Sequence, residues 1–513
     1  MYQATHLPGV RDWLAHRAVA TPDRLALVDA PSGRRETYAE VDTAVEECAA
    51  RLAALGVGVG SHLGVVVSRR PAAVYTAHAA MRVGATLVPL SAKLTPAELG
   101  PRAERAELDL LLCEAGTEDA AAAADVPTYS IDDRSDWTEV ASDADGGDDE
   151  PPDLLDASPS TFDLPEWELD DPLVMLYTSG TTGRPKLVVL TAKNVLASAG
   201  ASAFRLGHDP ADRWCSPLSP ASMGGLAPVY RCALYGTGLV LAPTDPAPLA
   251  RAMAEHGVTG VSLVPVLLER LLDAADLPGG LRTVLLGGAP APASLIERCA
   301  ERGVPVAPTY GATETASQIA TARPAEATAH PGTVGRPLFM TDVSVVDDRG
   351  RPVERGETGE LVVAGPTVTP GYYDDPAATA EAFSPHGFRT GDLGYRDDAG
   401  RLYVVGRRSE RIVTGGETVD PAEVAAAVRS LPGVADAAVV GLPDEEFGER
   451  VAALVEPAGD GIAPEELRDA LRDRLAGYKL PRTVAVGEIP RTESGTVDRA
   501  ATRERLLGES QGA

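Results

Sequence analysis

The sequence predicts an α/β protein with a large N-terminal domain, made of two doubly wound βα subdomains and a small β-barrel subdomain, followed by a small α+β C-terminal domain. Two separate series of amphipathic helical stretches alternate with short apolar runs, and short strands broken by glycine turns come after them. A length of 513 residues also exceeds what one core usually holds. We expect the larger domain to span residues 1–406 and the smaller one residues 407–513.

The order of the elements supports this division. Residues 37–94 alternate amphipathic helical stretches with apolar runs closed by Gly or Pro, and residues 171–335 repeat the rhythm. Each series predicts a parallel sheet covered by helices. Residues 334–405 carry short alternating strands separated by Gly turns, which predict the small barrel. Residues 142–156 are acidic and rich in Pro and Gly, and they predict a solvated linker or surface loop.

The C-terminal segment has the size of a domain that folds alone. Helices are predicted over residues 421–433 and 463–478, where Pro and Glu suit the helix starts. Strands are predicted over residues 435–442 and 451–457. We expect the hinge between the two domains near residues 406–410.

The composition argues against several classes of protein. A formal net charge of -29 makes nucleic acid an unexpected partner. The five cysteines are widely spaced without a C-x-x-C pair, which indicates reduced thiols. No apolar run approaches the roughly 20 residues of a membrane span, and no basic segment followed by an apolar stretch opens the chain. We therefore expect a cytoplasmic protein without a membrane span, and a homo-oligomer is compatible with these features.

The segment YTSGTTGRPK, Tyr177 to Lys186, lies between two apolar runs that predict strands. Its hydroxyls and backbone N–H groups would surround a polyanion, and Lys186 adds a positive charge. Lysine is scarce here, with four among 46 basic residues, so each lysine is a stronger functional candidate than usual. The spacing differs from that of the common P-loop, and no helix start follows the lysine. We interpret the segment as a phosphate-binding loop; the alternative is a glycine turn in a β-hairpin.

Six further motifs follow in order along the chain: LLGGAP at 285–290, TYGATETAS at 309–317, GYYDDPAATAEAF at 371–383, RTGDLGY at 389–395, GRRSERIVTGGETVDPAEV at 406–424 and PRTESG at 490–495. On these motifs and the loop, which together cover almost the whole chain, the sequence resembles the adenylate-forming (AMP-binding) superfamily of acyl-CoA synthetases, adenylation domains and luciferases. The resemblance implies ATP, Mg²⁺ and coenzyme A as cofactor and co-substrates. It also implies that the small C-terminal domain is mobile.

The resemblance assigns roles to particular residues. Tyr310 would offer an aromatic face to adenine, and Glu314 would offer a carboxylate to Mg²⁺. Asp392 would accept hydrogen bonds from the ribose, to which Arg407 would donate. Taken alone, each would more readily be a core, turn or surface residue. The residues expected to bind ATP or AMP are Thr178, Ser179, Gly180, Thr181, Thr182, Gly183, Lys186, Gly288, Ala289, Pro290, Thr309, Tyr310, Gly311, Thr313, Glu314, Asp392 and Arg407. Those expected to act in catalysis are Lys186, Thr182, Glu314 and Arg407.

The implied reaction has two steps. Joining a carboxylate to AMP removes its negative charge and supplies a leaving group, and pyrophosphate is released; a thiol then attacks the acyl-adenylate and expels AMP. In the family the C-terminal domain rotates between the two steps about a residue that corresponds to Ser409. A loop containing Gly415 and Gly416 would then reach the pantetheine channel of coenzyme A. From the residues alone, Gly415 and Gly416 predict a tight turn.

Within the superfamily, residues 214–241 and the TETASQ sequence at 313–318 resemble the o-succinylbenzoate-CoA ligases of menaquinone biosynthesis. Arg231 lies in an otherwise apolar helical stretch, where a buried guanidinium needs an anionic partner. We interpret it as a binding group for the aromatic carboxylate of a dicarboxylic substrate. The alternative is an arginine that reaches the surface. Gly287 and Ser317 are assigned to the same small-molecule carboxylic acid.

Two positions depart from the family. Many relatives carry an aromatic-His pair where Ala221 and Ser222 stand here, so one wall of the acid pocket must be built differently. The C-terminal signature of the family ends in S-G-K, whereas here Thr496 replaces the lysine that contacts the carboxylate and the α-phosphate. Loss of such a group costs about 10²- to 10³-fold in rate. Arg491 and Arg499 are candidate substitutes for it.

The sequence therefore predicts an ATP-dependent ligase that forms 2-succinylbenzoyl-CoA from o-succinylbenzoate and coenzyme A through an acyl-adenylate, releasing AMP and pyrophosphate. Two alternatives stay open: an acyl-CoA synthetase for another aromatic or aliphatic acid, and a catalytically silent relative that binds nucleotide or acyl-adenylate. A silent protein need not keep all four of the intact residues Lys186, Glu314, Asp392 and Arg407, so they argue against that alternative. A peptide-synthetase module is disfavoured because no carrier domain follows the C-terminal domain.

The acid excess, 75 Asp and Glu against 46 Lys and Arg, indicates a carboxylate-rich surface adapted to high salt. A GC-rich genome explains the preference for Arg over Lys but not this excess. We predict that activity falls steeply in low-salt buffer, because unscreened carboxylates repel one another. The measurement is acyl-adenylate formation over a series of KCl concentrations, and full activity without added salt would contradict the prediction.

Overall fold

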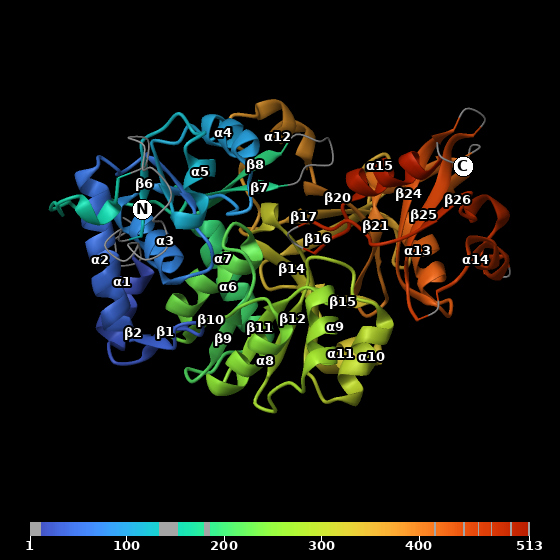
Figure 1. The fold of residues 1–513 in the computed structure, drawn as a ribbon, viewed down its shortest axis with the longest axis horizontal. Coiled ribbons are helices and arrows are strands. Elements are labelled where there is room, and N and C mark those ends of the chain that lie inside the picture. Colours follow the sequence, from blue (N-terminus) through green and yellow to red (C-terminus); the bar gives the residue numbers. More distant parts are fainter. Residues whose placement is uncertain are drawn as a thin grey trace, which may run out of the picture. The chain divides into compact units, whose positions relative to one another are not determined.

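The computed structural model describes residues 12–132, 152–178, 185–414, 417–444, 447–459, 461–472, 474–492 and 495–510. The chain divides into two compact units (Figure 1). The first comprises Met1–Gly287, Ala291–Asp342 and Val363–Phe388, and the second comprises Gly288–Pro290, Val343–Val362 and Arg389–Ala513. The predicted α/β fold class is confirmed by two βα sheets, a run of short strands and a C-terminal α+β segment.

The first unit contains two sheets, one for each of the two predicted series of alternating helices and strands. In the larger of these the strand order is β15 (Thr333–Pro337), β14 (Ser317–Thr321), β13 (Val306–Ala312), β12 (Thr283–Leu286), β11 (Gly260–Leu263), β9 (Arg213–Ser216), β10 (Gly238–Leu241), β1 (Leu25–Asp29) and β2 (Arg34–Thr37). The strands from β13 to β1 in this order are parallel. The edge strands β2, β14 and β15 pair antiparallel. The antiparallel β13–β14 pair carries the predicted nucleotide motif.

The second sheet of this unit has the order β18 (Gly371–Tyr372), β8 (Lys186–Thr191), β7 (Pro172–Thr178), β4 (Thr86–Pro89), β3 (His62–Val66), β5 (Leu110–Cys113) and β6 (Thr128–Ser130). The strands from β7 to β6 are parallel, whereas β7 and β8 form an antiparallel pair. The predicted phosphate-binding loop connects β7 to β8, as its two apolar flanks indicated.

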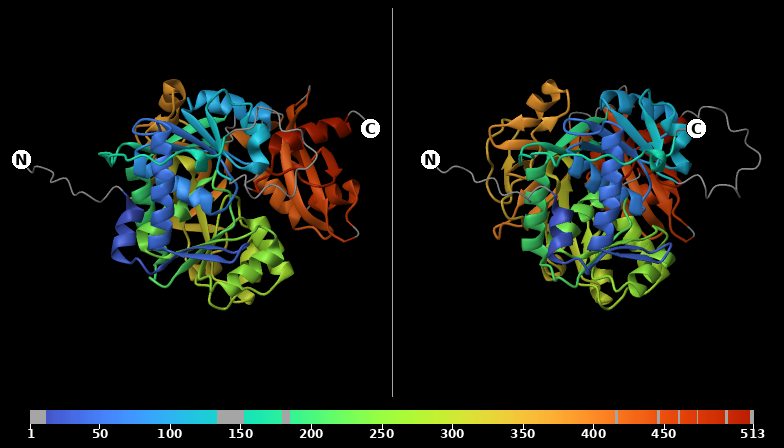
Figure 2. Two further views of the ribbon diagram at one scale, coloured as in Figure 1. Left: turned by 60° about the vertical axis from the view of Figure 1, so that its left-hand side comes forward. Right: turned by 90° about the vertical axis from the view of Figure 1, so that its left-hand side faces the viewer.

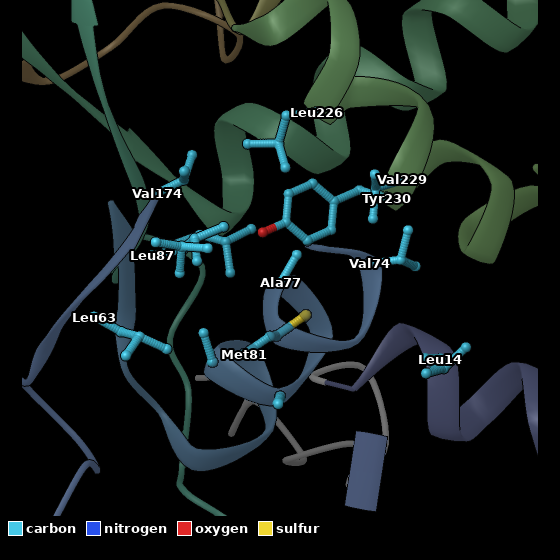
Figure 3. Close-up of a cluster of buried hydrophobic side chains, with 14 of the residues drawn as sticks. Leu14, Leu63, Val74, Ala77, Met81, Leu87, Val174, Leu226, Val229 and Tyr230 are labelled. Atoms are coloured by element: carbon cyan, nitrogen blue, oxygen red, sulfur yellow. The ribbon is translucent and has the colours of Figure 1, made fainter. Parts of the chain in front are cut away.

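Helices cover the sheets because alternate strand residues point to opposite faces. On one face of the larger sheet, Cys215, Val261 and Val284 pack with α8 (Pro246–Glu255), α9 (Pro265–Ala274) and α10 (Ala293–Glu301). On its other face Leu239 joins a core that also contains side chains of α6 (Ala192–Leu206), α7 (Met223–Tyr235) and the second sheet. Figure 2 shows the ribbon from two further sides. Figure 3 shows Tyr230 of α7 in this core.

In the second unit, β16 (Asp342–Val346), β17 (Gly359–Ala364), β20 (Gly387–Arg396) and β21 (Leu402–Arg407) are neighbours in that order. The C-terminal segment forms a sheet of β23 (Glu417–Val419), β22 (Ile412–Thr414), β25 (Gly448–Pro457) and β24 (Val434–Asp444), with β26 (Thr483–Val486) parallel to β25. One face packs on α13 (Pro421–Arg429) and α14 (Pro464–Leu471), and the other on α15 (Arg499–Ser510).

Several predicted elements differ in extent. The helix predicted over residues 421–433 ends at Arg429. The helix predicted over residues 463–478 ends at Leu471, and a separate 3₁₀ turn covers Gly477–Lys479. Gly477 disfavours a continuous helix, since Gly costs about 1 kcal/mol relative to Ala there. The last part of the loop predicted at 142–156 forms a 3₁₀ turn, Leu154–Asp156, in which Leu154 is buried; residues 142–151 lie outside the described part of the chain.

None of the five cysteines, all of which are described, forms a disulfide, and four of them are buried. In the part of the chain that the structure describes, no helix is long and apolar enough to cross a membrane.

A buried arginine joins three helices of the first unit, since it lies on α3 (Pro71–Val83) and pairs with residues of α2 (Tyr38–Ala54) and with Asp12, the N-cap of α1 (Trp13–Ala20). Arg82 is 4% exposed, and its Nε donates to Asp12 Oδ2 at 2.5 Å. It also pairs with Asp42 and, at 3.0 Å, with Glu46, both on α2. One turn earlier on α3, His78 packs edge-on against Tyr230, with ring centroids 5.7 Å apart. Burial lowers the pKa of His78 to about 4.

We predict that this histidine makes the first unit less stable in mild acid. The pKa of His78 in the folded protein lies below its ordinary value of 6.5. The contribution of the neutral imidazole to the free energy of unfolding is therefore complete above pH 6.5. It decreases by about 3 kcal/mol as the pH falls from 6.5 toward 4. The non-ionising variant His78→Gln should lose this part of the pH dependence. Urea unfolding of both proteins at pH 7 and pH 5 measures it, and parallel pH slopes would contradict the assignment.

Candidate adenylation site

The β13–β14 hairpin carries most of the predicted site residues of the first unit. Gly311 and Gln318 are register partners, and a Cβ at Gly311 would lie 1.7 Å from the carbonyl oxygen of Ser317. Only glycine therefore fits at position 311. Thr309 donates its hydroxyl to Ala320 O at 2.9 Å, and Tyr310 is 9% exposed. The close approach of the two strands holds these residues in place.

The turn of this hairpin is strained. Ala316 has φ 52° and Ser317 has φ 122°, left-handed values that cost a non-glycine residue about 1–3 kcal/mol each. Ser198 of α6 compensates by donating its hydroxyl to Ala316 O at 2.7 Å. Because such strain gathers at functional sites, the backbone angles indicate a functional site at the turn around Glu314, independently of the sequence motif at 309–317.

Tyr372 joins Glu314 to Lys186. Its hydroxyl donates to Glu314 Oε1 at 3.1 Å, and Lys186 Nζ lies 4.6 Å from the centroid of its ring. The backbone N–H of Thr369 donates to Glu314 O at 2.8 Å. Glu314 and Lys186, which are far apart in the sequence, are thus both held by one tyrosine of β18. Tyr372 was not among the predicted site residues, although its place in the motif at 371–383 was a signal for it.

The phosphate-binding loop leaves the sheet at the end of the β7–β8 pair. Thr178 and Lys186 are register partners, and the Thr178 hydroxyl donates to Lys186 O at 3.5 Å. The remaining predicted loop residues lie outside the described residues: Ser179, Gly180, Thr181, Thr182 and Gly183. The two ends of the loop are therefore brought together by backbone pairing, with Lys186 as the first residue of β8.

In the second unit the two predicted ribose-binding residues face each other across β20 and β21. Asp392 and Arg407 are register partners, and Arg407 Nε lies 3.0 Å from Asp392 Oδ1. Asp392 is 7% exposed, so its carboxylate is buried beside a cation. Gly288 of the predicted Gly288-Ala289-Pro290 turn has φ 82°, which glycine adopts without a steric cost.

The predicted hinge residue Ser409 lies in the 3₁₀ turn Arg408–Glu410, directly after β21. Glu410 pairs with Arg499 at 2.8 Å. Burial raises the pKa of the Glu410 carboxyl, while Arg499 and Arg407 oppose that rise. Gly415 and Gly416 lie outside the described residues.

Thr496 closes a turn with Thr492 rather than presenting a charge. Their hydroxyl oxygens are 2.6 Å apart, and Thr492 N donates to Thr496 O at 2.8 Å. Arg491 pairs with Asp436, and Arg499 pairs with Glu410. Each candidate substitute for the missing lysine is thus already bound by a carboxylate of its own unit.

The predicted acid-binding arginine is buried. Arg231 is 7% exposed, so the surface-reaching alternative is wrong. Its Nη1 donates to the hydroxyl of Ser202 at 3.1 Å and to Gln318 Oε1 at 3.3 Å. Its guanidinium carbon lies 5.2 Å from the centroid of the Trp214 ring. A cavity next to Arg231 is lined by Ser202, Trp214 and Arg231 together with Pro228, Tyr235, Gly260 and Thr283, and also by Asp212 and Arg282. Gln318 does not line it.

Gly287 lies next to Thr309 of β13, and Ser317 is the first residue of β14. A Cβ at Gly287 would lie 2.7 Å from Thr309 Cγ2, so this position also admits only glycine without displacement of Thr309. Ser317 directly precedes Gln318, the residue bound to Arg231. The structure therefore places the predicted acid-binding and nucleotide-binding residues of this unit on one hairpin and its neighbours.

A glycine-rich loop ending in a lysine, a carboxylate on a strained turn and a buried Asp-Arg pair define the class of adenylate-forming enzymes. The chain matches the AMP-binding enzyme model over residues 14–373 and the AMP-binding enzyme C-terminal domain model over residues 423–496. It belongs to the AMP-binding enzyme family.

Two curated relatives and one solved structure are similar to the chain over nearly its whole length. The chain is 36% identical over 491 residues to the 2-succinylbenzoate–CoA ligase of Bacillus licheniformis, covering 95% of this chain and 98% of that protein. It is 38% identical over 500 residues to the 2-succinylbenzoate–CoA ligase of Geobacillus kaustophilus, covering 94% of each. A solved o-succinylbenzoate CoA synthetase from Bacillus subtilis, in complex with its acyl-adenylate intermediate, matches with a TM-score of 0.87 and 33% identity, covering 97% of this chain and 98% of that one.

We predict that Tyr372→Phe weakens the apparent affinity for Mg²⁺ about 10-fold, because Glu314 loses the donor that orients it. The ring, and with it the contact to Lys186, is kept. The measurement is the adenylation rate against MgCl₂ concentration at saturating ATP. Tyr373→Phe is the matched control, since the Tyr373 hydroxyl bonds Glu107 instead. An unchanged Mg²⁺ dependence in Tyr372→Phe would show that Glu314 does not need this donor.

Proposed function

We propose that this chain is an acid-thiol ligase that converts 2-succinylbenzoate and coenzyme A into 2-succinylbenzoyl-CoA through an acyl-adenylate, with release of AMP and pyrophosphate, as menaquinone biosynthesis requires. The observation that carries the proposal is Arg231, a buried cation bonded to neutral oxygens. The named activity of the relatives agrees with a substrate that brings a second carboxylate.

We assign the phosphates to the loop Thr178–Lys186, the adenine to Tyr310 and the ribose to Asp392 and Arg407. Glu314 fits Mg²⁺, a hard cation that prefers carboxylate oxygen. Among the described residues no group of three or more Asp, Glu, His or Cys could hold a metal ion. A site with one carboxylate suits Mg²⁺, because this ion usually keeps several waters and binds substrate phosphates. The Bacillus subtilis relative has been solved with ATP and a magnesium ion.

The protein's part in the chemistry is placement and charge. Bound Mg²⁺ would neutralise charge on the phosphates. Lys186 would stabilise the negative charge that develops as pyrophosphate leaves, and the predicted loop would donate N–H groups to the same oxygens. Tyr372 would fix the positions of the Glu314 and Lys186 side chains relative to each other. The aliphatic carboxylate of the acid is the one to be activated, so it belongs near Ser317 and Gly287.

We further propose that residues 407–513 form the mobile domain and turn about Ser409 between the two half-reactions. The position of Ser409 in a short turn right after β21 supports this, since hinges are often a few residues at the end of an element. Gly415 and Gly416 would then line the path of the pantetheine arm.

The test is pyrophosphate exchange and thioester formation with 2-succinylbenzoate against a panel of aromatic and aliphatic acids, in high salt. Exchange and thioester formation with 2-succinylbenzoate above all other acids is expected. A preference for another acid would favour the broader acyl-CoA synthetase. No exchange with any acid would favour a catalytically silent relative.

We predict that Thr496→Lys raises the rate of adenylation at least about 10-fold, because it restores a cation at the position that the family uses. Thr496→Met introduces a side chain of about the same length as lysine but without its charge, so the adenylation rate of this variant should not rise. Single-turnover formation of the acyl-adenylate measures the first step, and thioester formation from the isolated adenylate measures the second, which should not change. If Thr496→Lys brings no gain, another group has taken over the role.

A further inference from the structure

The structure contains two buried arginines with opposite surroundings. Arg82 is 4% exposed and pairs with three carboxylates, from Asp12, Asp42 and Glu46. Arg231 is 7% exposed, and no carboxylate of the described residues pairs with it. A buried guanidinium is ordinarily neutralised by an anion of the protein. The charge of Arg231 is therefore not neutralised by a carboxylate of the described residues, and it can attract an anionic ligand.

Gln318 is held so that it can only accept from Arg231. Its Nε2 donates to Thr321 Oγ1 at 2.7 Å, and this hydroxyl lies 2.8 Å from Thr309 Oγ1, which donates to Ala320 O. This chain of hydrogen bonds sets the amide orientation, with Oε1 toward Arg231 at 3.3 Å. Ser202 accepts from the same Nη1 atom. Nε and Nη2 of the guanidinium make no hydrogen bond to the described residues, so these donors remain available to a ligand.

Trp214 gives the guanidinium a fixed aromatic surface. Its indole Nε1 donates to Ser262 Oγ at 3.1 Å. Gly260 makes room for the ring, because a Cβ there would lie 2.4 Å from the indole. A cation over the face of Trp is attracted by the ring without losing its charge. The cavity next to Arg231 is lined by Trp214 and Gly260 as well.

We propose that Gln318 and Ser202 are positioning residues that make the enzyme selective for a diacid, by holding Arg231 with neutral acceptors toward the second, aromatic carboxylate of the substrate. This inference rests on the proposed function. A carboxylate at position 318 would satisfy Arg231 from within the protein and repel the second carboxylate of the acid. Neutral acceptors orient the guanidinium without competing for it.

The test compares 2-succinylbenzoate with 4-oxo-4-phenylbutanoate, which has the same skeleton but lacks the aromatic carboxylate. The substitution Gln318→Glu keeps the shape of the side chain and adds a charge. It should raise the KM for the diacid about 10- to 100-fold, the effect of losing hydrogen bonds to a charged group, and lower kcat/KM for the monoacid much less. Gln318→Met removes the acceptor without adding charge, so Arg231 keeps its charge and the loss for the diacid should be smaller.

Thermal unfolding of each variant verifies that it is folded. If Gln318→Glu does not fold, Ser202→Asp offers a carboxylate to the same Nη1 atom from α6 and should show the same selective loss. Equal losses for both acids, or equal effects of Glu and Met at position 318, would overturn the inference and indicate a packing role. An unmodified enzyme that activates other acids but not 2-succinylbenzoate would instead defeat the proposed function. Normal use of the diacid by the folded Gln318→Glu variant would defeat this inference alone.

Discussion

The close approach of β13 to β14 at Gly311 is the constraint on which the predicted site of the first unit depends. With a Cβ excluded at this position, the two strands come near enough for Ala316 and Ser317 to take left-handed backbone angles. Tyr310 precedes the contact, Glu314 occupies the turn, and Gln318 follows on the returning strand. One backbone contact therefore sets the relative positions of groups assigned to the nucleotide, the metal and the acid.

The protein treats its positive charges in two different ways. Arg82 and Arg499 are bound by carboxylates, Arg82 by those of Asp12 and Asp42 and Arg499 by that of Glu410. Lys186 and Arg231, in contrast, face aromatic rings. An aromatic ring orients a cation but leaves its charge in place, whereas a carboxylate cancels it. Arg82 and Arg499 thus stabilise the fold, whereas Lys186 and Arg231 keep a charge that suits an anionic substrate.

Much of the fold was predictable because hydrophobic periodicity and glycine turns act locally. The hairpin β7–β8, the start of the helix α13 and the strands β24 and β25 lie where their patterns indicated. The helix after residue 463 was predicted too long, because a periodic pattern does not show where packing ends. Asp392 and Arg407 were predicted as a pair of ribose ligands, and strand register explains why they meet.

The sequence by itself determined the class of enzyme, since loop and turn motifs consist of neighbouring residues whose chemistry does not depend on distant contacts. It also showed the missing lysine at position 496. Only the tertiary structure decided that Tyr372 joins Glu314 to Lys186 and that Arg231 is buried with Ser202, Gln318 and Trp214. These groups come from strands and helices far apart in the chain, and their meeting depends on strand order and helix packing, which no local pattern encodes.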